Sequence, residues 1–269
     1  MAEKTVQQAT PLFLIAPPRS GTTILARLLN AHPRILLTNE TAVFLQLGEM
    51  IGKSRQGVRA GLLFGKEYHK LWASHLEKNA KRLIEDYYTD IALHERKARL
   101  TYWGEKHPHL YAHLPLIQSL YPQAMYIYVL RDPRDAACSI AKMNRVAIPE
   151  ALQTWKQFSD PYEQFADELP AQRLIRVRYE DLVQDYTGVV QQILSRLSLS
   201  MPLKQRLFIV RHKDANAHAA PQRLEPRVNY GQTSRERWRR DMNEEEQAQA
   251  LELLGGFLRK YGYEGGDAS

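Results

Sequence analysis

Five consecutive residues with small or basic side chains, Arg19-Ser20-Gly21-Thr22-Thr23, carry the clearest chemistry in the chain. They follow a short apolar run, residues 12–16, and precede apolar residues at helical spacing, which predicts strand, loop and helix in that order. Such a loop presents backbone N–H groups at the positive end of a helix dipole. Gly21 lets this backbone approach an anion, and Arg19 and the threonines add donors. The loop therefore predicts an anion site, although a plain capped turn would use similar residues.

The loop departs from the usual pattern of nucleotide-triphosphate sites, G-x-x-x-x-G-K-[ST]. Ala16 stands at the first glycine position, and Thr22 replaces the lysine that reaches the terminal phosphates. The cation is instead Arg19, earlier in the loop. This pattern argues against an ATP-dependent kinase and favours a ligand with a different terminal group.

Two further strand ends carry polar groups, at Glu105-Lys106-His107 and at Arg131. In an open parallel sheet, ligands bind outside the carboxyl ends of the strands. If the strands are neighbours, we expect these groups and the Arg19 loop to converge on one crevice.

Three segments resemble motifs of the sulfotransferases that use 3′-phosphoadenosine 5′-phosphosulfate (PAPS). The segment Pro18 to Thr23 resembles the loop that binds the 5′-phosphosulfate, which implies roles for Arg19, Ser20, Gly21, Thr22 and Thr23. Arg131, with Ser139 eight residues later, resembles the 3′-phosphate motif, and Tyr179 matches the tyrosine that packs near the adenine. The resemblance covers roughly residues 10 to 260 and is weak between 45 and 100. It implies PAPS as co-substrate, a hydroxyl acceptor and no metal.

The acceptor hydroxyl needs a base, and the sequence offers two candidates. The stretch from Arg19 through His32-Pro33 to Glu40 is similar to the opening of the tyrosylprotein sulfotransferases, where the glutamate at this spacing is the base. His107 is the rival, because cytosolic sulfotransferases use a histidine two residues after a lysine. Here His107 and His109 lie one and three residues after Lys106, so Glu40 is favoured and Lys106 adds a second cation.

The basic segment 235–240 resembles the region that folds over the nucleotide's 3′-phosphate. The sequence does not single out one of its arginines, and a solvated helix end is the alternative. The aromatic residues expected of a nucleic-acid binder are sparse there, so no nucleic-acid partner is predicted.

Alternating elements must position these residues. Strands are predicted at 12–16, 100–104, 125–130 and 174–179, and helices at about 24–30, 68–99, 114–120, 138–143, 186–197 and 243–261. This alternation predicts an α/β fold, and the resemblance implies a P-loop-like three-layer form with a central, mainly parallel sheet flanked by helices. We expect a single domain over residues 1–269. Residues 1–10 would be flexible, and the helical segment 41–99 would lie on the acceptor side.

Composition narrows the class of protein. A formal charge of +7 in 269 residues favours anionic partners. The single cysteine, Cys138, excludes a disulfide framework within the chain. The N-terminus lacks a signal-peptide core and no run is long enough to span a membrane, so a cytoplasmic protein is expected. A small-molecule kinase and a non-catalytic nucleotide or nucleic-acid binder are the alternatives. The acceptor, as a peptide tyrosine, a small-molecule alcohol or phenol, or a lipid, stays open, as does a homodimer.

Overall fold

Five parallel strands form the central sheet of the computed structural model, which describes residues 3–59, 66–217 and 235–263. The strands are β1 (Thr10–Ile15), β2 (Ile35–Asn39), β3 (Tyr102–Lys106), β4 (Met125–Leu130) and β5 (Leu174–Arg178), in the spatial order β2-β3-β1-β4-β5. Helices flank the sheet, so the predicted P-loop-like α/β fold is confirmed.

The helices account for most of the remaining described residues. They are α1 (Glu3–Gln8), α2 (Thr22–Asn30), α3 (Val43–Arg59), α4 (Lys66–His94), η1 (Leu110–His113), α5 (Leu114–Leu120), α6 (Pro133–Asn144), α7 (Ile148–Glu168), η2 (Ala171–Arg173), α8 (Tyr179–Gln184), α9 (Tyr186–Arg196), α10 (Leu203–Ala217), α11 (Trp238–Asp241) and α12 (Glu244–Lys260). The chain divides into two units: unit 1 comprises residues 1–13 and 33–126, and unit 2 comprises 14–32 and 127–269.

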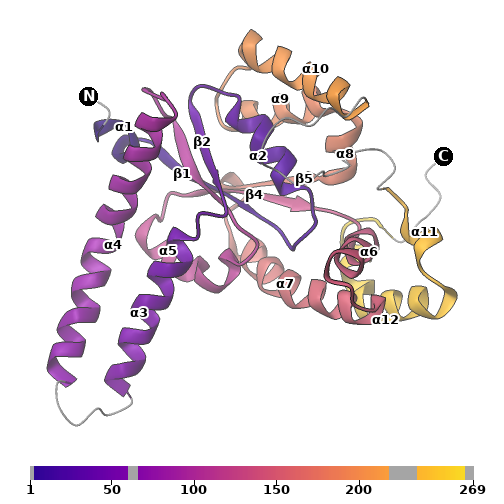
Figure 1. The fold of residues 1–269 in the computed structure, drawn as a ribbon, viewed down its shortest axis with the longest axis horizontal. Helices are drawn as coiled ribbons and strands as arrows, with labels where there is room; N and C mark the ends of the chain where they lie inside the picture. The colour runs from indigo at the N-terminus through magenta and orange to yellow at the C-terminus, as the bar shows by residue number, and fades with distance from the viewer. Residues whose placement is uncertain (1–2, 60–65, 218–234, 264–269) are drawn as a thin grey trace. The chain divides into compact units, whose positions relative to one another are not determined.

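Unit 1 contains the predicted helical segment 41–99 as two long helices, α3 and α4, which lie side by side as a hairpin (Figure 1). An aromatic cluster packs at the base of this hairpin. Phe44 of α3 meets Phe13 edge to face at 5.0 Å, and Tyr88 of α4 lies 4.5 Å from Trp103 of β3. Aromatic pairs at such distances contribute beyond the area they bury, so the hairpin is firmly seated on its part of the sheet.

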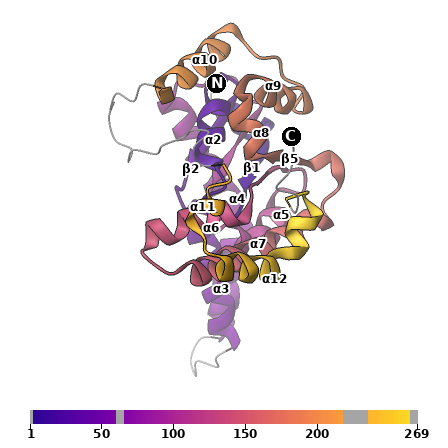
Figure 2. The same cartoon turned by 90° about the vertical axis from the view of Figure 1, so that its right-hand side faces the viewer.

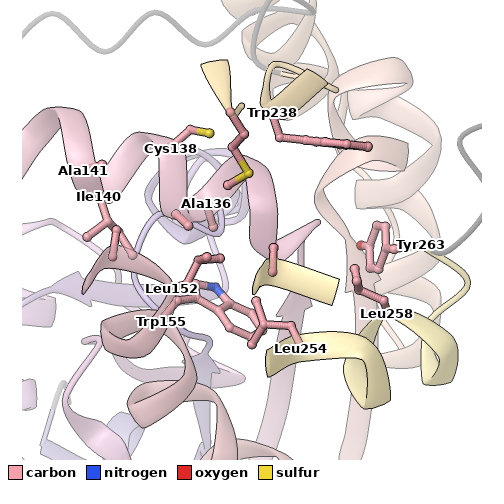
Figure 3. Packing of buried hydrophobic residues seen from close by; sticks show 14 residues of the cluster. Ala136, Cys138, Ile140, Ala141, Leu152, Trp155, Trp238, Leu254, Leu258 and Tyr263 are labelled. Carbon is pink, nitrogen blue, oxygen red and sulfur yellow. The ribbon is translucent and has the colours of Figure 1, made fainter. Parts of the chain in front are cut away.

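Unit 2 buries a cluster between α6, α7, α11 and α12 (Figure 3). Trp155 of α7 is 1 % exposed and meets Phe257 of α12 edge to face at 4.9 Å. The predicted C-terminal helix is confirmed as α12, where Asn243 and Glu246 form a reciprocal capping box. Elsewhere in this unit, α9 and α10 pack against α2 (Figure 2).

The strand β2 is absent from the sequence prediction, which placed a helix end at Pro33 and nothing regular before Glu40. Residues 35–38 are buried, as an apolar run in a strand should be, and β2 pairs in parallel with β3. The register sets Ile35 opposite Tyr102 and Asn39 opposite Lys106. The run was missed because it is short and lies directly after a helix end.

The N-terminal segment contains regular structure, because residues 3–8 form α1 and Thr10 begins β1. Val6 is 1 % exposed, and its carbonyl accepts a hydrogen bond from Trp103 Nε1 at 3.1 Å, so a buried partner orders this segment. The helix α7 was not predicted, because Pro149 and Pro161 interrupt its pattern.

A substitution at Gly104 of β3 tests how closely the backbones of β3 and β1 approach each other. A Cβ there would overlap the backbone of Leu12 in β1, which cannot move aside as a side chain can. We expect Gly104→Ala to cost about 1–3 kcal/mol and to lower the Tm by roughly 2–10 °C in a thermal melt. Gly52→Ala is the matched control, because a Cβ there meets open space. A wild-type Tm for Gly104→Ala would contradict this account of the close approach.

Candidate active site

The predicted anion loop lies in unit 2, between β1 and α2. Gly21 is the N-cap of α2 with φ 88°, and Arg19 has φ 68°, an uncommon conformation for a residue with a side chain. Ser20 is buried and its hydroxyl donates to the Pro17 carbonyl at 2.8 Å, which fixes the turn from within. Because the N-cap is a glycine, no side-chain cap hydrogen bond is made to the first N–H groups of α2.

Tyr179 explains why residue 21 is a glycine. A Cβ on Gly21 would overlap the ring of Tyr179, which begins α8 just after β5. The sequence suggested that Gly21 permits close approach of an anion. The structure adds that the same glycine permits close approach of the tyrosine predicted to pack near an adenine.

Arg131 ties these segments together. Arg131 follows the last residue of β4, and its side chain is buried, with 6 % of the residue exposed. Its Nη1 donates to the carbonyl oxygen of Arg19 at 2.5 Å. Its guanidinium carbon lies 4.3 Å from the centre of the Tyr179 ring. Ser139 of α6 accepts a hydrogen bond from Arg19 Nε at 3.1 Å. Unit 2 therefore brings Arg19, Gly21, Arg131, Ser139 and Tyr179 together from four separate segments.

Two aspartates follow Arg131 closely in the chain. Asp132 caps α6 and forms a bidentate pair with Arg134, at 3.0 Å to Nε and 2.7 Å to Nη2. Asp135 accepts backbone hydrogen bonds from Glu236 at 2.8 Å and Trp238 at 3.1 Å. Burial raises the pKa of Asp135 to about 6.

The two hydrogen bonds that Asp135 accepts attach the basic segment 235–240 to α6, the helix that carries Ser139. Three of its arginines pair with carboxylates: Arg237 and Arg240 with Asp241, and Arg239 with Glu236. Arg235 is exposed. The sequence did not identify Asp135 as the anchor, since an acidic residue in a first helical turn is commonplace.

Glu40 and Lys106 lie in unit 1, where the structure brings them together. Lys106 ends β3 and is 4 % exposed, and its Nζ donates to Glu40 Oε1 at 2.5 Å. The Glu40 backbone N–H also donates to the Lys106 carbonyl at 2.9 Å, which continues the pairing of β2 with β3. The Glu40 side chain is 47 % exposed, so one face of the carboxylate meets solvent. This arrangement places a proton acceptor beside a cation.

Glu105 holds the turn that carries Glu40, a role that sequence reasoning missed. Its carboxylate is fully buried, and Oε1 accepts from the Ala42 backbone at 2.8 Å and from the Thr41 hydroxyl at 3.1 Å. Glu40 and Ala42 both have positive φ, 58° and 62°. Burial raises the pKa of Glu105, and the Ala42 hydrogen bond opposes that effect. A buried carboxylate next to a lysine has no sequence signature of its own.

His107, the rival base, is partly buried, and burial lowers its pKa below 6.5. Its Nδ1 accepts a hydrogen bond from the His109 backbone N–H at 3.1 Å. A neutral histidine that accepts through Nδ1 carries its proton on Nε2. In this arrangement the imidazole is therefore a donor, not an acceptor, towards a substrate.

Within residues 3–59, 66–217 and 235–263, no group of three His, Cys, Asp or Glu side chains is arranged to hold a metal ion. Within the same ranges, no helix combines the length and apolar character needed to cross a membrane.

Solved structures with a similar fold are sulfotransferases. The sulfotransferase domain of the olefin synthase from Synechococcus PCC 7002 matches 93 % of this chain and 95 % of its own at a TM-score of 0.61 and 19 % identity. The mouse sulfotransferase SULT7A1, solved in complex with PAP, matches 96 % of this chain and 89 % of its own at a TM-score of 0.57 and 14 % identity. At such low identity these likenesses establish the fold.

Sequence comparison is more specific. The nodulation protein NoeE of Sinorhizobium fredii is 32 % identical over 130 residues, which is 48 % of this chain and 30 % of that protein. The chain thus spans under a third of that relative. The model of the sulfotransferase family matches residues 11–202, more than half of the chain, which includes the segments at 18–23, 131–139 and 179. This chain is therefore a member of the sulfotransferase family.

Proposed function

We propose that the protein transfers the sulfuryl group of PAPS to a hydroxyl acceptor. The observation that carries this proposal is the meeting of Arg19, Arg131, Ser139 and Tyr179 beside the N-terminus of α2. These groups suit the two anionic groups of PAPS, the 3′-phosphate and the 5′-phosphosulfate, which are attached at different positions of the ribose. The mouse structure that contains PAP, the product of PAPS, supports the choice of donor.

Each donor-side residue has a role in the proposal. A 3′-phosphate carries about two negative charges, which Arg131 and the Ser139 hydroxyl would bind by charge-assisted contacts. The N–H groups of α2 with Thr22 and Thr23 would hold the 5′-phosphosulfate. Arg19 would stabilise the charge that grows on the leaving phosphate. Arg235, exposed at the start of the basic segment, would be a further 3′-phosphate contact.

The transfer step forms one bond and breaks one bond. The acceptor oxygen attacks sulfur in line with the bridging oxygen, the bond from sulfur to that oxygen breaks, and PAP leaves with the electron pair. Glu40 accepts the hydroxyl proton as it becomes acidic. Lys106 would supply positive charge near the reacting groups, and protein cations carry the electrostatic stabilisation in this scheme.

Two features support Glu40 over His107 as the base. The Glu40 carboxylate is half exposed and is held by a buried lysine. His107 uses Nδ1 to accept a backbone hydrogen bond, so in its neutral form it offers an N–H to the acceptor. A base must present a lone pair, which Glu40 does.

Nucleotide binding tests the donor. At 100 times its Kd, a ligand adds about 2.7 kcal/mol to stability, so PAP should raise the Tm by roughly 5–10 °C without magnesium. Arg131→Lys keeps the charge but loses the planar fork, and should abolish most of the rise. Arg206→Lys, at an exposed arginine of α10, is the matched control. No rise with millimolar PAP, or a rise only with ATP and magnesium, would overturn the proposed donor.

The rate of sulfate transfer in two variants tests which residue is the base. We expect Glu40→Gln to lower kcat by about 10²-fold or more while the Tm rise with PAP is retained. His107→Asn should lower kcat far less, because its imidazole is not the proton acceptor. Sulfate transfer from labelled PAPS is the measurement. Near-normal transfer by Glu40→Gln together with loss in His107→Asn would reverse the assignment.

A further inference from the structure

An open groove runs between α3 and α4 within unit 1, and its lining differs from the rest of this basic protein. Its volume is about 340 Å³, and it is lined by Thr41, Val43, Gln46, Leu47, Met50, Leu83 and Tyr87. None of these seven residues is charged. We call this feature the hairpin groove. Its two walls are the helices that lie side by side in Figure 1.

The walls of the hairpin groove expose large apolar side chains. Leu83 is 55 % exposed, Met50 45 % and Tyr87 37 %. A single exposed apolar residue is ordinary. Three large apolar side chains from two helices that line one hollow mark a binding surface.

The floor of the groove is rigid. Leu47, which lines it, is 6 % exposed, and the neighbouring Phe44 and Tyr88 are fully buried in the aromatic cluster. The Tyr88 hydroxyl pairs with Thr38 Oγ1 at 2.9 Å, and the same Thr38 oxygen donates to the Gly104 carbonyl at 3.2 Å. The hollow is therefore preformed against the sheet, as binding sites for small molecules usually are.

One end of the groove lies at the turn of residues 40–42, which carries the proposed base Glu40. Thr41 lines the groove, follows Glu40 directly, and donates its hydroxyl to Glu105. From there the α3 wall extends from Val43 to Met50, about 10 Å along a helix that rises 1.5 Å per residue. A molecule lying along this wall would end with one group at Thr41, the residue that follows Glu40.

We propose that the hairpin groove binds the apolar part of the acceptor, so that the acceptor is an alcohol or phenol with an extended apolar body. This inference rests on the proposed function and names its substrate class. The continuity of the groove with Glu40 selects this occupant. A sugar or an acidic peptide would find few polar partners among the described lining residues, whose polar side chains are those of Thr41, Gln46 and Tyr87.

A homologous series of primary alcohols, from butanol to octanol, tests this directly. Each methylene buried in the groove should raise kcat/KM for sulfate transfer by roughly two- to fourfold. Leu83→Ser should flatten the series and leave the Tm rise with PAP unchanged. Leu93→Ser is the matched control, since Leu93 is 57 % exposed on the same helix and does not line the groove. A series that is flat in the wild type, or equally steep in Leu83→Ser, overturns the inference while the transfer reaction itself stands.

A binding measurement separates this inference from the proposed reaction. Saturation-transfer NMR with octanol and the full chain should show binding that weakens at least threefold in Leu83→Ser and not in Leu93→Ser. Octanol binding with that pattern supports the groove as the site of an apolar body, whereas failure of every class of hydroxyl acceptor to take sulfate from labelled PAPS would refute the proposed function alone. Absence of octanol binding to the wild-type protein overturns the groove.

Discussion

A buried polar side chain near the end of a strand holds each group of candidate site residues. In unit 1 the carboxyl group of Glu105, near the end of β3, accepts hydrogen bonds from the Ala42 N–H and the Thr41 hydroxyl. In unit 2 the guanidinium of Arg131, just after β4, donates to the carbonyl of Arg19. Burying a polar group is costly unless it forms hydrogen bonds, so each of these side chains favours one backbone conformation of its loop. The candidate site residues are then oriented by that backbone.

The same buried side chains, Glu105 and Arg131, stabilise backbone conformations that the chain would otherwise avoid. Arg19, Glu40 and Ala42 all have positive φ although none is glycine. Each such residue costs on the order of 1–3 kcal/mol, whereas a hydrogen bond to a charged group contributes about 1.5–3 kcal/mol. The two effects are of similar size, so strain at these turns is tolerable only while the buried partner is in place. Removing Glu105 or Arg131 would therefore release a loop as well as a contact.

The local backbone could be predicted from the sequence where residue types are constrained over a few positions. The loop at residues 18–23 follows a strand and starts a helix as predicted, and Arg131 and Ser139 share one short segment. Reasoning failed where a residue's role depends on distant partners. The run at 35–39 became a strand only by pairing with β3, and Glu105 acquired its role only by burial beneath the turn at 40–42. The pairing of Glu40 with Lys106 follows from that strand and could not be read from their separation of 66 residues.

The acceptor side is the hardest part to read from sequence for the same physical reason. A phosphate site needs donors at fixed positions, which restricts residue types and leaves a recognisable motif. The hairpin groove needs only apolar surface at helical spacing, a requirement that many sequences meet and that also describes ordinary core residues. Leu83 and Met50 differ from core residues only in being exposed, which is a property of the fold. In this chain, therefore, the proposed donor follows from motifs, whereas the proposed class of acceptor follows from the apolar side chains that the helices leave exposed.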